Sequence, residues 1–102
     1  MLAILENRRH MIAAACAKHG VGHLYVFGSA LREDFRPRGS DIDLLVEFPP
    51  MEPFALVDAH FGLLDDLRSL IGTDVDLVMA SALKNRYVAA QVNRDRQLLY
   101  AA

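Results

Sequence analysis

Residues 40–46 read Ser40-Asp41-Ile42-Asp43-Leu44-Leu45-Val46, two aspartates followed by an unbroken apolar run. The run predicts a strand over residues 41–48 that is buried on both faces. Because residues two apart on a strand face the same side, Asp41 and Asp43 are expected to project together. Mg²⁺ relieves the repulsion between such carboxylates, and it binds through one or two of them together with substrate phosphates. The stretch therefore predicts a central strand with a magnesium site at its entrance. The alternative is a strand that simply begins with two solvated acids.

A candidate phosphate site precedes this strand. Residues His23–Phe27 predict a short strand, and Gly28-Ser29 follows it, before a polar segment over residues 30–40 that is expected to form a helical turn and a loop. Glycine lets the backbone approach a ligand closely, and a helix N-terminus offers free N–H groups to phosphate, although most Gly-Ser pairs are simple turns. The short return favours antiparallel neighbouring strands, which would place this motif and the two aspartates at one edge of the sheet.

A third carboxylate lies farther along the chain, in the stretch Thr73-Asp74-Val75-Asp76-Leu77-Val78. The pattern predicts a strand over residues 74–79, with Asp76 inside it and Asp74 solvated near its start. An unpaired carboxylate within an apolar strand is unfavourable, so Asp76 is expected to have a partner, either a shared metal ion or a nearby Arg or Lys. Three carboxylates beside a phosphate seat would form the arrangement that two-metal phosphoryl transfer requires.

Two helical segments flank these strands. Residues 3–19 predict a helix that ends at Gly20, and residues 53–71 predict a second helix that ends at Gly72. The apolar stripe expected on the second helix consists of Val57, Phe61, Leu64 and Leu67.

The C-terminal part of the chain predicts one more helix and one more strand. Ser81 is expected to cap a helix that runs to about residue 94, with Leu83, Tyr87 and Ala90 on one side. Residues 98–100 are expected to add an edge strand. The whole pattern predicts an α+β fold in which helices cover a small mixed β-sheet.

The composition predicts one domain over residues 1–102. The formal net charge of −2 argues against direct binding of nucleic acid, because proteins that bind it present a clustered basic surface. Cys16 is the single cysteine, which excludes an internal disulfide, and its run of alanines favours a small buried thiol. Neither a signal peptide nor a membrane span is expected, and a cytoplasmic location fits these features.

The signature of the minimal nucleotidyltransferases of the DNA polymerase β superfamily resembles two stretches of this chain, Phe27-Gly28-Ser29 and Asp41-Ile42-Asp43-Leu44-Leu45-Val46. The later Val75-Asp76-Leu77-Val78 is similar to the strand that supplies the third carboxylate of that family. The resemblance covers nearly the whole chain and implies a polymerase β-like nucleotidyltransferase fold. In one departure, the segment between Ser29 and Asp41 is one residue longer than is usual in the family.

The resemblance also implies roles for individual residues. It implies that Asp41, Asp43 and Asp76 are the catalytic residues and bind two Mg²⁺ ions, with Asp76 helping to deprotonate the acceptor. ATP is the implied substrate. The nucleotide-binding residues are expected to be Gly28, Ser29, Ser40 and Arg32. Arg32 flanks the phosphate seat, where it would either neutralise triphosphate charge or belong to a solvated loop.

Chains of this family commonly partner HEPN-type RNase toxins in toxin–antitoxin modules. The resemblance therefore implies an antitoxin that transfers AMP from Mg-ATP to a hydroxyl of a HEPN toxin, typically on a tyrosine. Two alternatives stay open from the sequence. The first is a non-catalytic antitoxin that neutralises its partner by contact alone, and the second is a nucleotidyltransferase for a small molecule.

Overall fold

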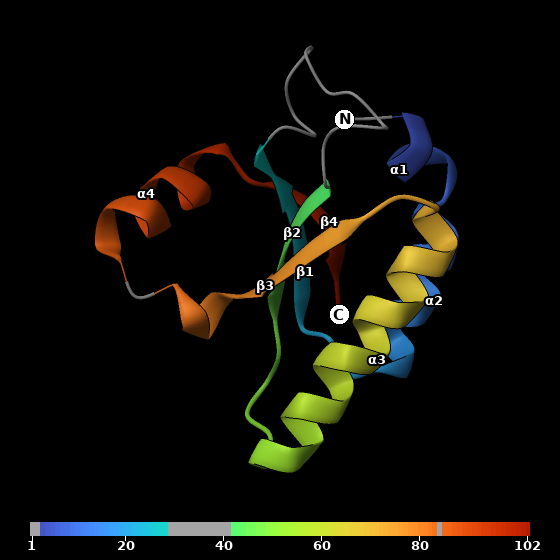
Figure 1. Cartoon of the computed structure of the whole chain (residues 1–102), viewed down its shortest axis with the longest axis horizontal. Coiled ribbons are helices and arrows are strands. Elements are labelled where there is room, and N and C mark those ends of the chain that lie inside the picture. The colour runs from blue at the N-terminus through green and yellow to red at the C-terminus, as the bar shows by residue number, and fades with distance from the viewer. Residues whose placement is uncertain (1–2, 29–41, 84) are drawn as a thin grey trace.

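The computed structural model describes residues 3–28, 42–83 and 85–102. Its elements are α1 (Ala3–Asn7), α2 (Arg9–Lys18), β1 (His23–Phe27), β2 (Ile42–Glu47), α3 (Pro53–Ile71), β3 (Val75–Met79), the 3-10 helix η2 (Ala80–Ala82), α4 (Arg86–Asp95) and β4 (Gln97–Ala101). The predicted α+β class with a mixed sheet is confirmed (Figure 1). The helical turn predicted within residues 30–40 lies outside the described residues.

The four strands form one sheet in the order β3-β2-β1-β4. β1 pairs antiparallel with both β2 and β4, whereas β2 and β3 are parallel. A parallel pair needs a long crossover connection, and α3 supplies it between β2 and β3. The antiparallel pairing expected for β1 and β2 is confirmed, and so is the edge strand at the C-terminal end.

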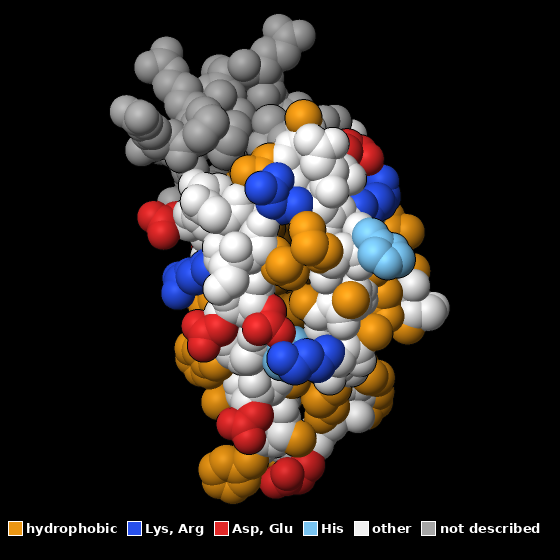
Figure 2. All heavy atoms as spheres, turned by 90° about the vertical axis from the view of Figure 1, so that its right-hand side faces the viewer, with side chains coloured by type: hydrophobic (Ala, Val, Ile, Leu, Met, Phe, Trp, Pro, Cys, Tyr) orange, Lys and Arg blue, Asp and Glu red, His pale blue; other side chains and the backbone are white. Residues whose placement is uncertain are grey.

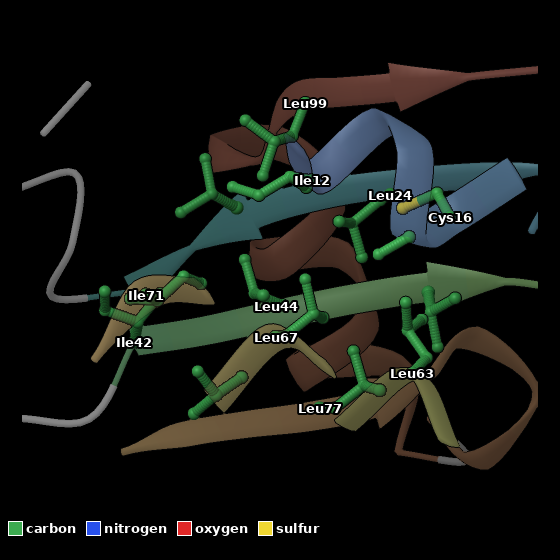
Figure 3. Close-up of a cluster of buried hydrophobic side chains, with 14 of the residues drawn as sticks. Ile12, Cys16, Leu24, Ile42, Leu44, Leu63, Leu67, Ile71, Leu77 and Leu99 are labelled. Atoms are coloured by element: carbon green, nitrogen blue, oxygen red, sulfur yellow. The ribbon is translucent and has the colours of Figure 1, made fainter. Parts of the chain in front are cut away.

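The hydrophobic core lies between one face of the sheet and the helices α2 and α3, while α4 lies on the other side of the sheet (Figure 1). Ile42 and Leu44 of β2 pack in the same cluster as Leu63 and Leu67 of α3 (Figure 3). Because side chains alternate along a strand, Leu45 points to the opposite face, where it is also fully buried. The prediction that β2 is buried on both faces is therefore confirmed.

The predicted apolar stripe of α3 is wrong at two of its four positions. Leu67 is buried as expected, but Val57 is 50% exposed and Phe61 is 60% exposed. Leu63 and Ile71 take part in the core instead. The helix carries apolar residues at helical spacing on more than one side, so its sequence periodicity alone does not select the side that meets the sheet.

The first predicted helix is interrupted. It is divided at Arg8 into α1 and α2, and α2 buries Ile12, Ala15 and Cys16. The predicted burial of the cysteine is confirmed, and burial raises the pKa of the Cys16 thiol to about 12. Within the described residues, no helix combines the length and apolar character that crossing a bilayer requires.

The last predicted helix begins later than expected. Ser81 lies in η2, and α4 starts at Arg86 with Asn85 as its N-cap. The side-chain oxygen of Asn85 accepts hydrogen bonds from the backbone N–H groups of Tyr87, at 2.9 Å, and Val88, at 3.3 Å. The predicted Ser81 cap is wrong because Asn85, another good capping residue, satisfies the free N–H groups of the first turn.

This cap gives a test of the helix boundary. Asn85→Ala should lower the free energy of unfolding by about 1 kcal/mol in urea denaturation, because two N–H groups lose their acceptor. Ser81→Ala is the matched control, and its free energy of unfolding should stay close to that of the parent. Equal losses for the two variants would contradict the boundary.

A polar cluster joins α2 to α3. His19 Nε2 lies 2.8 Å from Asp66 Oδ2, and Lys18 Nζ lies 3.4 Å from the same oxygen. The hydrogen bond with His19 is the main cause that holds the pKa of Asp66 below its ordinary value, and Lys18 adds to it. Ionised Asp66 therefore stabilises the contact between the two helices.

The sign of this pKa shift predicts how stability depends on pH. A lowered folded-state pKa stabilises the protein above the unfolded-state pKa of about 3.9, and the stabilisation is lost as pH falls through the folded-state value. Asp66→Asn should therefore lose less stability than the parent in thermal melts below about pH 5. Asp65→Asn, at the exposed neighbouring acid, is the control and should follow the parent. If the melting temperatures of Asp66→Asn and the parent fall equally as the pH is lowered below about 5, this role of Asp66 is contradicted.

Candidate active site

Three side chains form a row across the sheet at the end where β2 and β3 begin. Phe27 of β1 pairs with Asp43 of β2, and Asp43 is in register with Asp76 of β3. Residues paired in this way face the same side, and neighbouring strands lie about 4.8 Å apart. Since Ile42 and Leu44 face α3, Asp43 and Asp76 lie beside each other on the opposite face. The sequence-based expectation that β3 delivers Asp76 beside Asp43 is confirmed.

Gly28 brings the end of β1 against this row. Its φ is +73°, in the left-handed region that favours glycine. A Cβ built on Gly28 would overlap the carboxylate of Asp43. The backbone of the predicted phosphate seat therefore touches one of the predicted metal ligands. This contact requires glycine both for its conformation and for the absence of a side chain.

The two carboxylates differ in exposure. Asp43 is half-buried, while Asp76 is exposed on β3, which forms an edge of the sheet. The expectation that Asp76 is enclosed by an apolar strand, and therefore requires an ionic partner, is wrong. Because side chains alternate, only Val75 and Leu77 are buried, and Asp76 faces solvent. Asp74 is exposed, as expected.

The remaining predicted site residues, Ser29, Arg32, Ser40 and Asp41, lie outside the described residues. In the part of the chain that the structure describes, no group of three or more His, Cys, Asp or Glu side chains is placed to hold a metal ion. The described portion of the site consists of Gly28, Asp43 and Asp76. A complete three-carboxylate site requires Asp41, which precedes β2 directly.

A cavity of about 190 Å³ opens beside Gly28 and is lined by Phe27, Gly28, Gln91, Val92 and Asp95. Sequence reasoning did not identify Gln91 and Asp95. Their spacing of four residues places them on one side of a helix, but only the tertiary structure places that side over the end of β1. The volume is below the roughly 300–1,000 Å³ of pockets for whole drug-sized ligands, so the cavity has room for only part of such a ligand.

Arg96 helps to hold α4 over this face. Its guanidinium carbon lies 3.9 Å from the ring centroid of Tyr25, and its Nη1 lies 3.7 Å from Glu47 Oε2. Tyr25 faces the same side of the sheet as Phe27, since the two are separated by one residue. The C-terminal end of α4 is therefore attached next to the row that contains Asp43.

A larger cavity, of about 450 Å³, lies near the opposite end of β2, between Phe48, Met51, Leu56 and Met79. Among the described residues that line it, Glu47 is the only one with an ionisable side chain. Neither Asp43 nor Asp76 lines this cavity, so it is not part of the candidate site for metal and phosphate.

Residues 8–99 match the family model of the nucleotidyltransferase domain. MJ0128 of Methanocaldococcus jannaschii, assigned as a protein adenylyltransferase, is 37% identical over 78 residues, which are 76% of this chain and 76% of that protein. The protein adenylyltransferase MntA of Thermococcus cleftensis is 38% identical over 68 residues, which are 67% of this chain and 65% of that protein.

Two solved structures have a similar fold. One, assigned as a minimal nucleotidyltransferase, is 33% identical, with a TM-score of 0.68, and the match covers 91% of this chain and 90% of that chain. The other is the tri-AMPylated HEPN toxin of Shewanella oneidensis in complex with MNT antitoxin, 21% identical with a TM-score of 0.65 over 96% of this chain and 73% of that chain. At that identity the second likeness concerns the fold alone.

The contact between Gly28 and Asp43 can be tested by comparing two glycines. Gly28→Ala and Gly72→Ala both place a Cβ on a left-handed residue, which destabilises each by about 1–2 kcal/mol. Gly72 has a φ of +78° and no atom within 4 Å of an added Cβ, so its variant measures the backbone term alone. Gly28→Ala should be the more destabilised of the two in urea denaturation. It alone should weaken Mg-ATP binding in calorimetry, because it displaces the Asp43 carboxylate. Equal stability losses together with unchanged Mg-ATP affinity would contradict the close approach.

Proposed function

The chain belongs to the nucleotidyltransferase domain family, and on this basis we propose that it transfers AMP from Mg-ATP to a hydroxyl of a partner protein. The partner proposed is a HEPN RNase toxin, the acceptor hydroxyl is that of a tyrosine, and the transfer makes the chain an antitoxin. The observation that carries this proposal is the row of Asp43 and Asp76, with the backbone of Gly28 against Asp43. Relatives named as protein adenylyltransferases support the choice of AMP and of a protein acceptor.

The described residues fit Mg²⁺. Asp43 and Asp76 supply carboxylate oxygens from adjacent positions of two parallel strands, and such oxygens are the ligands that Mg²⁺ prefers. Asp41 is proposed as the third ligand and two ions as the full complement. When bound, Mg²⁺ would offset the negative charge of the triphosphate and of the carboxylates that surround it.

The chain's own residues would then have the following roles. Gly28 and Ser29 bind the phosphates, and Ser40 and Arg32 add further nucleotide contacts. Asp76 accepts the proton of the acceptor hydroxyl while the hydroxyl oxygen forms a bond to the α-phosphorus and the bond from that phosphorus to pyrophosphate breaks. Asp76 is suited to this step because it is exposed on an edge strand, where the side chain of another protein can reach it.

The cavity beside Gly28 gives the nucleotide a second contact region. Phe27 offers an apolar ring, while Gln91 offers both a donor and an acceptor to polar edges of the base or the ribose. A nucleotide whose phosphates lie at Gly28 would extend toward these residues of α4. The same face of the sheet would then hold the nucleotide and the carboxylates.

The test of transfer uses Asp76→Asn, with a HEPN toxin as the acceptor protein. We expect intact-mass spectrometry to show whole AMP additions on the toxin after incubation with the parent and Mg-ATP. Asp76→Asn should lower the rate of addition by about 10²–10⁴-fold, because proton acceptance and metal positioning are lost. Asp43→Asn should lower it as well, and chelation of Mg²⁺ should abolish it.

Glu6→Gln is the matched control, because Glu6 is an exposed acid on α1, which packs on the face of the sheet opposite to Asp43. Its rate of transfer should equal that of the parent. If Asp76→Asn protects cells from the toxin fully in a co-expression growth assay while the toxin stays unmodified, neutralisation is steric and the enzymatic proposal is wrong. If AMP is transferred to a small molecule but never to the toxin, the proposed protein acceptor is wrong.

A further inference from the structure

The outer face of α3 carries an apolar stripe that the fold leaves uncovered. Seven large hydrophobic residues of the described chain are exposed, and three of them lie on α3: Phe54 at 79%, Phe61 at 60% and Val57 at 50%. Their spacing of three and four residues places them on one side of the helix. We refer to Phe54, Val57 and Phe61 as the α3 stripe. Contiguous exposed apolar surface of this kind marks interaction sites more often than single exposed residues do.

The α3 stripe has no role in the core, because a different side of the helix performs that role. Leu63, Leu67 and Ile71 are the buried residues of α3. Figure 2 looks onto the side of the molecule formed by α2 and α3, and it shows hydrophobic side chains next to acidic ones on this side. Truncation of the α3 stripe should therefore leave the fold intact.

The ring of Phe61 packs against a side chain that is itself hydrogen-bonded to the sheet. It makes an edge-to-face contact with the ring of His60, with centroids 5.1 Å apart. Nε2 of His60 in turn lies 2.9 Å from the carbonyl oxygen of Leu77, to which it donates. A side chain that is already ordered loses less entropy on binding, so Phe61 is suited to act as an anchor.

The spacing of the α3 stripe fits a helix. Phe54 and Phe61 are seven residues apart, about 10.5 Å along the helix axis, with Val57 between them. This is the a and d pattern by which two helices pack side by side at a small crossing angle. The two phenylalanines, separated by two full turns, would pack into successive holes of a partner helix.

The charges beside the stripe indicate the chemistry of that helix. Asp58 and Asp65 are exposed, and each follows a stripe phenylalanine by four residues, so they form an acidic flank along it. The exposed Arg68, seven residues after Phe61, lies beyond the last residue of the stripe, so the charge beside the stripe itself is acidic. A second copy packed antiparallel about Phe61 would bring Asp58 close to Asp65 of the other copy, and like charges there are unfavourable. A helix with Lys or Arg beside its apolar seam would complement this flank.

We propose that the α3 stripe is the docking surface for an amphipathic helix of the partner protein, one with basic residues beside its apolar seam. The surface begins just after the C-terminal end of β2, whereas Asp43 and Asp76 lie at the opposite end of the sheet (Figure 1). A partner held on α3 leaves the carboxylates free to receive an acceptor side chain. Docking and transfer are therefore separable, and their failures can be distinguished.

The experiment compares complex formation with nucleotide binding, and its choice of probe, the HEPN toxin used to test AMP transfer, rests on the proposed function. Phe54→Ser/Phe61→Ser should bind the toxin about 10-fold more weakly or worse in calorimetry, because both anchors are removed. Its melting temperature and its affinity for Mg-ATP should equal those of the parent. Met11→Ser is the matched control, since Met11 is exposed to 47% on α2 outside the stripe, and it should bind like the parent.

A second variant, Asp58→Lys/Asp65→Lys, tests the role of the acidic flank. It should weaken the complex and remove most of the dependence of its affinity on salt concentration. Parent-like binding by the double phenylalanine variant would overturn the docking surface, even if AMP transfer proceeds. Self-association of the parent that is lost in this variant would show that the occupant is a second copy and overturn the proposal. If the parent protein binds neither the toxin nor a second copy of itself, the docking proposal is also overturned. The proposed function is tested separately, by the mass of AMP added to the toxin.

Discussion

The register of β2 is the constraint on which the rest of the molecule depends. Its residues alternate between a face packed against α3 and a face that carries Asp43. A shift by a single residue would turn Asp43 into the core and bring Leu44 out of it, so burial of Ile42 and Leu44 fixes the direction of the carboxylate. The same register places Phe27 and Asp76 on either side of Asp43. The hydrophobic core thus determines the geometry of the candidate active site.

Gly28 extends this constraint from side chains to the backbone. The end of β1 can lie against the Asp43 carboxylate only because residue 28 lacks a Cβ and adopts a positive φ. The proposed phosphate seat and the proposed metal ligand are thereby in contact without any flexible side chain between them. Such preorganisation suits the transfer of a charged group, in which most of the catalysis comes from position and electrostatics.

The proposed chemistry and the proposed recognition of the partner use opposite ends of the sheet. At one end, Asp76 is exposed on an edge strand, which suits a reaction whose acceptor belongs to another protein. Near the other end, α3 begins and presents Phe54 and Phe61 to solvent. An acceptor that is bound at a separate surface can still be oriented toward the carboxylates. AMP transfer and helix docking, as proposed, use different residues of the fold.

The sequence by itself determined the features that depend on local pattern. The apolar run after Asp43, the strand ending at Gly28 and the helix from Pro53 to Ile71 were all predicted, because burial and backbone conformation restrict residue types there. It also predicted that Asp43 and Asp76 would lie together. Asp41, Ser29, Ser40 and Arg32 lie outside the described residues, so their placement stays a prediction.

Only the tertiary structure decided between local options of similar quality. Phe61 and Leu63 are both apolar and both at helical spacing, and the position of the sheet selected Leu63 for the core. Ser81 and Asn85 are both good caps, and the start of α4 selected Asn85. Asp76 is exposed because it alternates with the buried Val75 and Leu77 on a strand at the edge of the sheet, and the sequence does not reveal that edge position. Each of these outcomes depends on contacts between segments far apart in the chain, and such contacts leave no periodicity in the sequence around the residue concerned.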